Sequence, residues 1–291
     1  MNKNRYFFGL CAAVCLGAFA GQVQATEIEP YEYVAAPAGT KLVAFYGYYG
    51  RHDQYQAAGG PKQDASLETW TGVAKAATYF DLGGKRALLS VVQLFGSSED
   101  LSIAGSTPVK GSGLGDTILG AAYWPISNDR TNLAAALYVT VPTGRYDRHR
   151  PVNMSGNRMV YNPGVSLNHK IDERWSFDLA ADVFLYGDND DSGAASQTLS
   201  QDASYQFQAF ANYAWDGGLT TSVGYQAFRG GRQELDGLDT GGRTDFDELR
   251  IAVGKAVTPQ LHLLGEINHQ FRSEGGFRQD FGFMGRVVYA F

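Results

Sequence analysis

The chain has 291 residues, of which 44% are hydrophobic and 19% are charged, and its formal net charge is −6. It contains 36 Gly, 17 Tyr and 17 Phe. Glycine is therefore well above its usual level of about 7%, which argues against a helical bundle and for many turns and strands.

The first 25 residues have the pattern of a secretory signal peptide. Lys3 and Arg5 precede a long apolar run, and Ala25 ends a small-residue cleavage site. Both cysteines, Cys11 and Cys15, lie inside this apolar run, so we expect the mature chain to have no thiol, disulfide or cysteine-metal site. An acidic secreted chain is a poor partner for nucleic acid.

Beyond residue 25 the sequence has no apolar run of about 18 residues, the length that a membrane helix needs. Three locations stay open at this point: the periplasm, the extracellular space, and the outer membrane for a chain that crosses it as a β-barrel.

The rhythm of turns favours the barrel. Five short polar turns are expected at 81–85, 127–131, 171–174, 216–218 and 258–260. Six longer connections, rich in Gly and Asp, alternate with them at 50–66, 96–113, 144–159, 187–200, 230–243 and 272–278. They separate twelve segments of roughly 9–13 residues, each long enough to cross a bilayer as a tilted strand. The sequence predicts an all-β, 12-stranded antiparallel outer-membrane β-barrel with short periplasmic turns and long extracellular loops.

Most segments alternate apolar and polar residues with period two, which separates a lipid-facing set from a lumen-facing set. Between 175 and 186, for example, Phe177 and Leu179 are expected to face lipid. The expected lumen and solute-path set is Lys75, Asp178, Asp182, Gln206, Gln208, Glu248, Arg250, Glu266, Asp280 and Arg286. The faces of 86–95 and 115–126 cannot be assigned, and a soluble β-sandwich would alternate too.

The C-terminus strengthens the membrane prediction. Phe283, Gly285, Val287, Tyr289 and Phe291 form one alternating face that ends on an aromatic carboxy-terminal residue, a pattern similar to the signal by which barrels are recognised for membrane insertion. We expect this segment to close the barrel against the first strand. The expected organisation is a signal peptide over 1–25, a periplasmic tail or lumen strap over 26–39, and the barrel over 40–291.

Several motifs, in this order, resemble an outer-membrane family named for the meta-pathway of phenol degradation, whose members are also described as transporters. The motifs are Tyr31-Glu32-Tyr33, Pro37-Ala38-Gly39-Thr40, Tyr79-Phe80-Asp81-Leu82-Gly83-Gly84, Gly113-Leu114-Gly115-Asp116, Tyr123-Trp124-Pro125, Pro142-Thr143-Gly144-Arg145-Tyr146-Asp147, Tyr186-Gly187-Asp188-Asn189-Asp190 and Gly275-Gly276-Phe277. The resemblance implies a barrel that passes aromatic or other hydrophobic solutes across the outer membrane. It also makes Asp116 a candidate residue of the channel mouth.

Two further groups of residues have candidate roles. Inward aromatics near the expected extracellular ends, Phe184, Phe210 and Phe228, would form an apolar entrance or fill space. Asp188, Asp190 and Ser192 copy the start of a calcium loop, but its twelfth position is Leu199 instead of Glu, so an ordinary loop is the better interpretation.

We therefore expect a channel for small hydrophobic or aromatic solutes in the bacterial outer membrane, without cofactor or enzymatic activity. Its expected partners are outer-membrane lipid, the β-barrel assembly machinery and the solute. Two alternatives stay open: an outer-membrane enzyme such as a lipid hydrolase, and a structural barrel with a closed lumen in which opposite charges pair.

Overall fold

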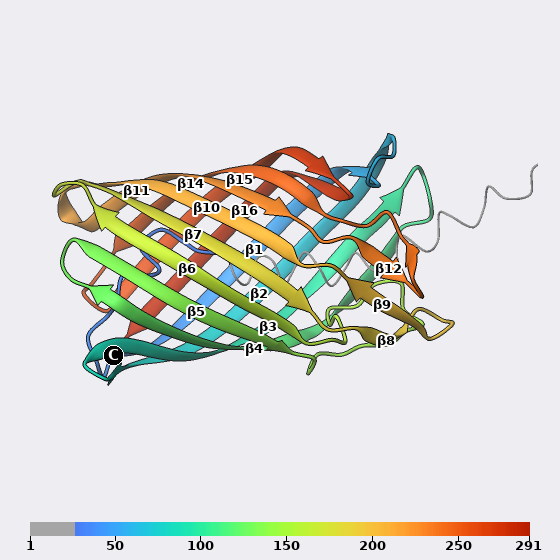
Figure 1. The fold of residues 1–291 in the computed structure, drawn as a ribbon. Coiled ribbons are helices and arrows are strands. Elements are labelled where there is room, and N and C mark those ends of the chain that lie inside the picture. The colour runs from blue at the N-terminus through green and yellow to red at the C-terminus, as the bar shows by residue number, and fades with distance from the viewer. Residues whose placement is uncertain (1–26) are drawn as a thin grey trace, which may run out of the picture.

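The structure, a computed structural model, describes residues 27–291; the expected signal peptide lies outside this part of the chain. Twelve strands form one closed antiparallel barrel (Figure 1). They are β1 (Lys41–Gln56), β2 (Lys62–Leu82), β3 (Lys85–Ile103), β4 (Val109–Ser127), β5 (Thr131–Val141), β6 (Val160–Lys170), β7 (Trp175–Tyr186), β10 (Ser204–Ala214), β11 (Leu219–Arg229), β14 (Asp245–Ala256), β15 (Leu261–Glu274) and β16 (Gly276–Ala290). The predicted fold class is confirmed.

The barrel closes between its first and last strands. β1 pairs with β16 from Leu42 opposite Ala290 to Gln56 opposite Gly276. The main-chain amide of Phe291 also donates to the carbonyl of Lys41 at 2.8 Å, so the pairing continues to the C-terminal residue. Closure leaves no strand edge with unpaired backbone groups, which a bilayer would penalise.

The outer surface of the barrel is apolar, with aromatic side chains gathered toward both ends. Near the short turns, the Tyr213 ring lies 4.8 Å from Trp175 and 4.6 Å from Trp215, measured between centroids. Toward the other end, the Tyr49 ring lies 4.6 Å from Trp70. Two aromatic bands around an apolar belt are typical of a barrel embedded in the outer membrane.

Strands β3 and β4 also alternate, although both of their faces are largely apolar. Val92 and Ile118 are buried toward the lumen, whereas Leu89 and Leu119 are about half exposed on the outer face. Because apolar side chains occupy both faces, polarity alone could not assign them in the sequence.

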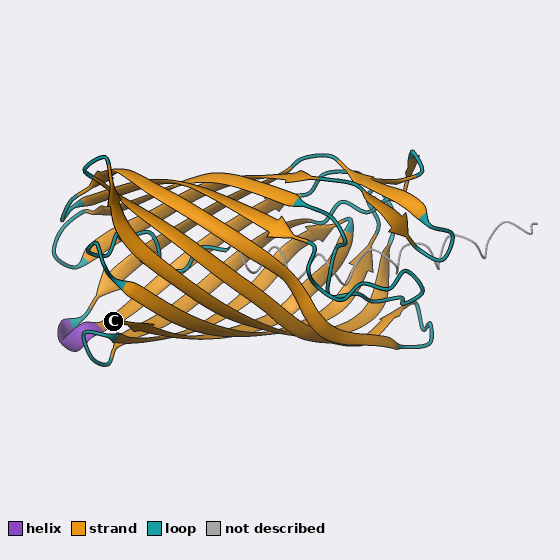
Figure 2. Cartoon of the chain, turned by 90° about the horizontal axis from the view of Figure 1, so that it is seen from below, coloured by secondary structure: helices purple, strands orange, loops and turns teal. Residues whose placement is uncertain are grey.

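The two ends of the barrel differ (Figure 2). The five predicted short turns lie at the end that holds the C-terminus, and one of them contains the 3₁₀ turn η2 (Asp216–Gly218). At the opposite, extracellular end the strands continue as hairpins, so the connections of β1 to β2 and of β15 to β16 are much shorter than predicted. Gly275, with φ 74°, makes the second of these turns.

Four short strands at the extracellular end were not predicted. They are β8 (Asn189–Ser192), β9 (Gln197–Gln201), β12 (Gln233–Leu235) and β13 (Leu238–Asp239), and they form a four-stranded sheet in the order β13-β12-β9-β8. They come from two successive extracellular loops, which connect β7 to β10 and β11 to β14. Within residues 27–291, no helix is long and apolar enough to cross a membrane.

Candidate functional site

A segment of chain ahead of β1 runs inside the barrel. Residues 27–38, here named the lumen strap, extend from the middle of the lumen to the periplasmic end. Ile28, Glu29 and Tyr33 are all buried. The Ile28 amide donates to Gln208 Oε1 at 3.0 Å, and the Tyr31 amide donates to Asp178 Oδ2 at 3.2 Å. These contacts join the strap to lumen-facing side chains of β7 and β10.

Arg250 anchors the upper part of the strap. Its guanidinium is fully buried and lies 4.8 Å from the centre of the Phe210 ring. It donates to two strap groups, the Ile28 carbonyl at 3.0 Å and Glu29 Oε1 at 3.1 Å. It also donates to the wall, at 2.8 Å to Glu266 Oε1. Because guanidinium presents several donors in a fixed plane, one side chain joins the strap to the wall.

Glu32 anchors the lower part of the strap. Lys75 Nζ donates to its Oε1 at 2.7 Å, and Arg286 Nη1 lies 3.7 Å from its Oε2. Lys75 comes from β2 and Arg286 from β16, so two wall cations share one strap carboxylate. These three side chains are largely buried, at 12–15% exposed. Buried pairs of this kind fix a position because separating them leaves an unpaired charge.

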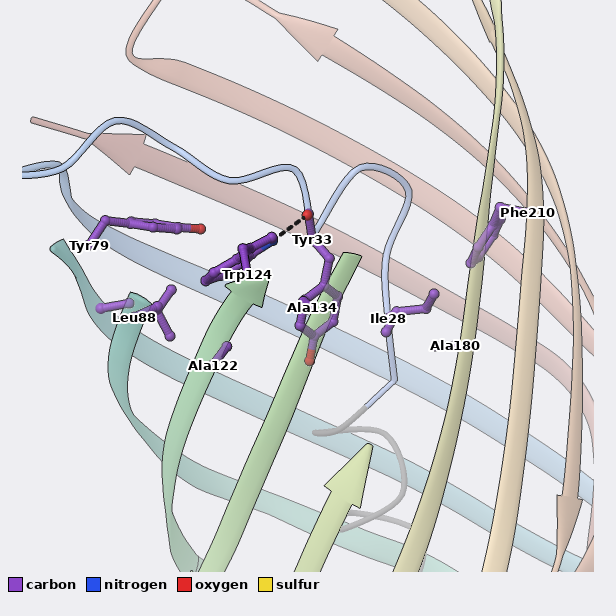
Figure 3. Close-up of a cluster of buried hydrophobic side chains, with 10 residues drawn as sticks. Ile28, Tyr33, Tyr79, Leu88, Ala122, Trp124, Ala134, Ala180 and Phe210 are labelled. Atoms are coloured by element: carbon purple, nitrogen blue, oxygen red, sulfur yellow. Dashed lines mark hydrogen bonds between the residues drawn. The ribbon is translucent and has the colours of Figure 1, made fainter. Parts of the chain in front are cut away.

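Aromatic side chains hold the strap at Tyr33, the residue that follows the lower anchor. The indole of Trp124 donates to the Tyr33 carbonyl at 2.9 Å (Figure 3). The Tyr33 and Tyr138 hydroxyls are hydrogen-bonded at 2.9 Å, and the Trp124 and Tyr79 rings lie 5.7 Å apart. The strap therefore packs on β2, β4 and β5 through apolar contacts as well as ion pairs.

Below the strap, the periplasmic half of the lumen contains a cavity of about 600 Å³. The strap lines it on one side, and the wall contributes aromatic and aliphatic side chains, among them Tyr46, Tyr79, Trp124 and Tyr138. Lys75 and Arg286 also reach this cavity. It is within the size range of small-molecule sites, which are about 300–1,000 Å³.

At the extracellular end the connection 142–159 folds back into the mouth. Asp116, fully buried on β4, accepts hydrogen bonds from the amides of Gly144 and Gly156, each at 3.0 Å. A Cβ at Gly144 would lie 2.7 Å from a backbone carbon of Gly115, so the close approach requires glycine. Val152, in the same connection, packs in a buried cluster with wall residues. Asp116 thus holds a loop at the mouth.

A polar contact ties this connection to the small sheet. Arg148 Nη1 donates to Asp191 Oδ1 at 2.6 Å. Hydrogen bonds from Ser196 and Arg148 lower the pKa of the Asp191 carboxyl. The charged pair therefore persists at neutral pH and links the two extracellular loops.

Nine of the ten predicted lumen residues point inward. They are Lys75, Asp178, Asp182, Gln206, Gln208, Glu248, Arg250, Glu266 and Arg286. The prediction for Asp280 was wrong. Its side chain is 33% exposed and pairs with Arg51, 2.8 Å away, on the outer surface. The register of β1 against β16 shifts after Arg51, and such a bulge reverses the alternation of faces.

The predicted apolar entrance needs a second correction. Phe184 and Phe228 are buried together at the extracellular side, 5.6 Å apart, and Phe246 joins them 5.5 Å from Phe228. Phe210 is also buried, but it lies deeper, beside Arg250. Phe246 was missed because the sequence places it directly after a long loop, where the alternation of faces has only just begun.

The candidate calcium loop is not formed. Asp188 and Asp190 are exposed, whereas Ser192 is buried, and 189–192 is an extended strand that does not wrap around a central point. Across the described residues, no group of three or more His, Cys, Asp or Glu side chains could hold a metal ion.

Sequence reasoning also missed the wall and strap residues that meet in the periplasmic half. Glu29 and Glu32 precede the first strand, where no alternation exists to reveal their direction. Trp124 lies in a segment whose two faces could not be separated. The Tyr31-Glu32-Tyr33 motif carries a signal only through the family resemblance.

The C-terminal aromatic row faces outward. Phe283, Val287, Tyr289 and Phe291 are 43–64% exposed on the outer surface of the barrel, with Gly285 between them. The structure thus gives this row the exposure to lipid that an insertion signal requires.

Comparisons with known proteins agree with this architecture. A family model described as "Putative MetA-pathway of phenol degradation" matches residues 49–284. The crystal structure of the COG4313 outer membrane channel from Pseudomonas putida F1 is 27% identical, with a TM-score of 0.86 over 91% of this chain and 100% of that chain. A comparison with curated protein sequences finds no match.

Two autotransporter domains share the fold alone. The transport unit of AIDA-I from Escherichia coli is 9% identical, with a TM-score of 0.58 over 96% of this chain and 99% of that chain. The β domain of BrkA from Bordetella is 12% identical, with a TM-score of 0.53 over 88% of this chain and 100% of that chain. With a family model covering most of its length and a closely superimposable channel structure, the chain belongs to this phenol-degradation family and is a β-barrel channel of the bacterial outer membrane.

Proposed function

We propose that the protein is a gated channel for small hydrophobic or aromatic solutes, and that the lumen strap is its gate. The observation that carries the proposal is that a segment of the chain, held only by noncovalent contacts, occupies the lumen between two apolar regions. Removing the strap would join these regions without opening the barrel wall.

The first apolar region lies near the extracellular mouth. Phe184, Phe228 and Phe246 bring three aromatic rings together beside the partly buried Tyr186. A solute that dissolves poorly in water gains free energy from such contacts, whereas a small hydrophilic solute gains none. This favours aromatic and other hydrophobic solutes.

The second apolar region is the periplasmic cavity, whose walls include Tyr79, Trp124 and Tyr138. Between the two regions lie Arg250 and the strap. The name of the family, which refers to phenol degradation, supports the same solute class.

We propose a channel without enzymatic activity. A hydrolase needs a histidine that activates a nucleophile or a second acid. His52 Nδ1 instead lies 3.1 Å from the carbonyl of Leu67, and His169 Nδ1 lies 2.9 Å from the Thr131 hydroxyl, with the His169 ring 5.5 Å from the outward-facing Phe177. Neither arrangement supports hydrolysis. A phospholipid-hydrolysis assay on the folded protein is the direct test, and measurable turnover would contradict this part of the proposal.

A structural barrel is the second candidate, since the strap makes a dense set of bonds in the lumen. The two candidates differ in how they respond to displacement of the strap. A structural barrel stays impermeable or unfolds, whereas a gated channel becomes permeable and stays folded.

Proteoliposomes loaded with this protein test the proposal. Radiolabelled phenol and toluene should enter them faster than they enter empty liposomes, with labelled sucrose as the hydrophilic control. The Ala35 amide lies 3.3 Å from Asn132 Oδ1, so a bismaleimide between Ala35→Cys and Asn132→Cys can tie the strap to β5. This crosslinked variant should admit the solutes no faster than empty liposomes do. Equal entry into empty, wild-type and crosslinked liposomes would refute the gate.

The remaining expected partners belong to the same proposal. The outward aromatic row that ends at Phe291 faces lipid and lies on the strand that closes the barrel. We propose that the β-barrel assembly machinery recognises this row during insertion.

A further inference from the structure

We propose that the periplasmic cavity binds aromatic carboxylates, and that the bound carboxylate replaces Glu32 on Lys75 and Arg286. The inference rests on the proposed function and names one solute class for it. Its basis is the contrast between the charge of this cavity and the charge of the chain.

The cavity is positively charged although the chain has a formal net charge of −6. Among the described residues that line it, Glu32 is the one carboxylate, and the four bases are Lys75, Lys170, Lys255 and Arg286. Lys75 and Arg286 are largely buried beside Glu32, whereas Lys170 and Lys255 are exposed at the periplasmic rim of the cavity. This excess of basic over acidic side chains attracts anions toward the cavity.

The geometry around Glu32 is that of a carboxylate site. Lys75 and Arg286 approach different oxygens of its carboxylate, at 2.7 Å and 3.7 Å. The carboxylate comes from the strap, and both cations come from the barrel wall. A ligand carboxylate of the same shape can therefore take the same position if the strap moves away.

The rest of the cavity suits an aromatic ring. Tyr46, Tyr79, Trp124 and Tyr138 line it together with aliphatic side chains from β3, β15 and β16. Aromatic and aliphatic walls with a few convergent charges are typical of sites for small amphipathic ligands. A ring with one carboxylate satisfies both parts of the site.

Ligand binding in the cavity opposes docking of the strap. A ligand on Lys75 and Arg286 excludes Glu32 from both cations, so it weakens the lower anchor. By linkage, the bound ligand weakens the docking of Glu32 by the same factor by which docked Glu32 weakens the binding of the ligand. The solute thus favours the open channel.

Isothermal titration of the full folded protein in detergent with sodium benzoate tests this inference. Benzyl alcohol has nearly the same shape without the charge, and sodium acetate has the charge without the ring. We expect benzoate to bind at least about tenfold more tightly than either. Equal binding of benzoate and benzyl alcohol would overturn the inference, and so would equal binding of benzoate and acetate.

Single-residue variants test whether benzoate competes with Glu32 or is only attracted by the positive charge of the cavity. Glu32→Gln should tighten benzoate binding about tenfold or more, because the competing charge is gone, while Lys75→Gln should weaken it by a similar factor. Lys85→Gln, at an exposed position outside the cavity where β3 begins, is the matched control and should change nothing. Unchanged or weaker binding by Glu32→Gln would overturn the inference. If Glu32→Gln does not fold, an unchanged benzoate affinity of Lys75→Gln would equally overturn the inference.

The two proposals fail separately. Entry of neutral phenol and toluene into proteoliposomes tests the gated channel and needs no anion. If these solutes enter and benzoate does not bind, only the carboxylate site is wrong. If benzoate binds and no solute enters, the channel function is wrong.

Discussion

Replacing Arg250 with Met should release the strap without unfolding the barrel. Arg250 donates to two strap acceptors, the Ile28 carbonyl and Glu29, and the same guanidinium is paired with Glu266 of the wall. Met is similar in length but carries no charge, so Glu29 and Glu266 would face each other without a cation between them.

The magnitude comes from these contacts. A net charge-assisted hydrogen bond contributes about 1.5–3 kcal/mol, and removing one partner of a buried pair costs about 3–5 kcal/mol. We therefore expect the docked state of the strap to lose about 3–5 kcal/mol, which corresponds to a shift on the order of a hundredfold or more in the equilibrium between docked and released strap.

Labelling of a single cysteine measures this shift. Both native cysteines lie in the expected signal peptide, so Ile28→Cys gives one thiol on the strap. Its reaction with a maleimide dye should be slow in the parent and at least tenfold faster with Arg250→Met. Arg174→Met, which removes a half-exposed arginine at a periplasmic turn, is the control.

Two results would contradict this role of Arg250. Equal labelling rates in the folded parent and in Arg250→Met would mean that the apolar contacts alone hold the strap. Loss of the heat-modifiable folded form would mean that Arg250 supports the barrel wall instead. Adding Glu29→Gln to Arg250→Met should partly restore protection, because one of the two opposed charges is removed.

Three other predictions concern the wall and the mouth. Leu179→Arg, on the outer face of β7, should destabilise the barrel by about 2–4 kcal/mol in urea titrations in lipid, and no change would mean that this face is not in the bilayer. Deleting Phe291 should lower the amount of folded protein in outer-membrane fractions; an undiminished amount would contradict its role in insertion. Replacing the entrance cluster, Phe184, Phe228 and Phe246, with serine should slow toluene entry into proteoliposomes while ion conductance stays the same or rises. Equal toluene entry would contradict the role of these rings as an entrance.

The barrel was predictable because lipid-facing and lumen-facing residues alternate regularly along its strands. Each strand must place apolar atoms toward lipid, so period-two alternation and the spacing of turns defined the strands, their order and most of the lumen set. Leu179 and Asp178, neighbours on one strand, face opposite sides as predicted. The bulge that turns Asp280 outward leaves no comparable signal, because it depends on how two distant strands pair.

The gate itself was only half predictable. The segment ahead of the first strand lacks periodicity, and its position depends on side chains from β2, β14 and β16 that meet only after the barrel closes. Lys75 and Arg286 were predicted to face the lumen, but their shared partner Glu32 was not. Long-range pairing of this kind is encoded in the closed structure and not in local sequence.

Single-channel conductance in planar bilayers, for the full chain and for a chain lacking residues 27–38, measures whether the strap closes the channel. We expect rare, brief openings for the full chain and a persistent, larger conductance for the deletion, with both proteins folded and heat-modifiable. Identical conductance of the two folded proteins would contradict the claim that the strap closes this channel.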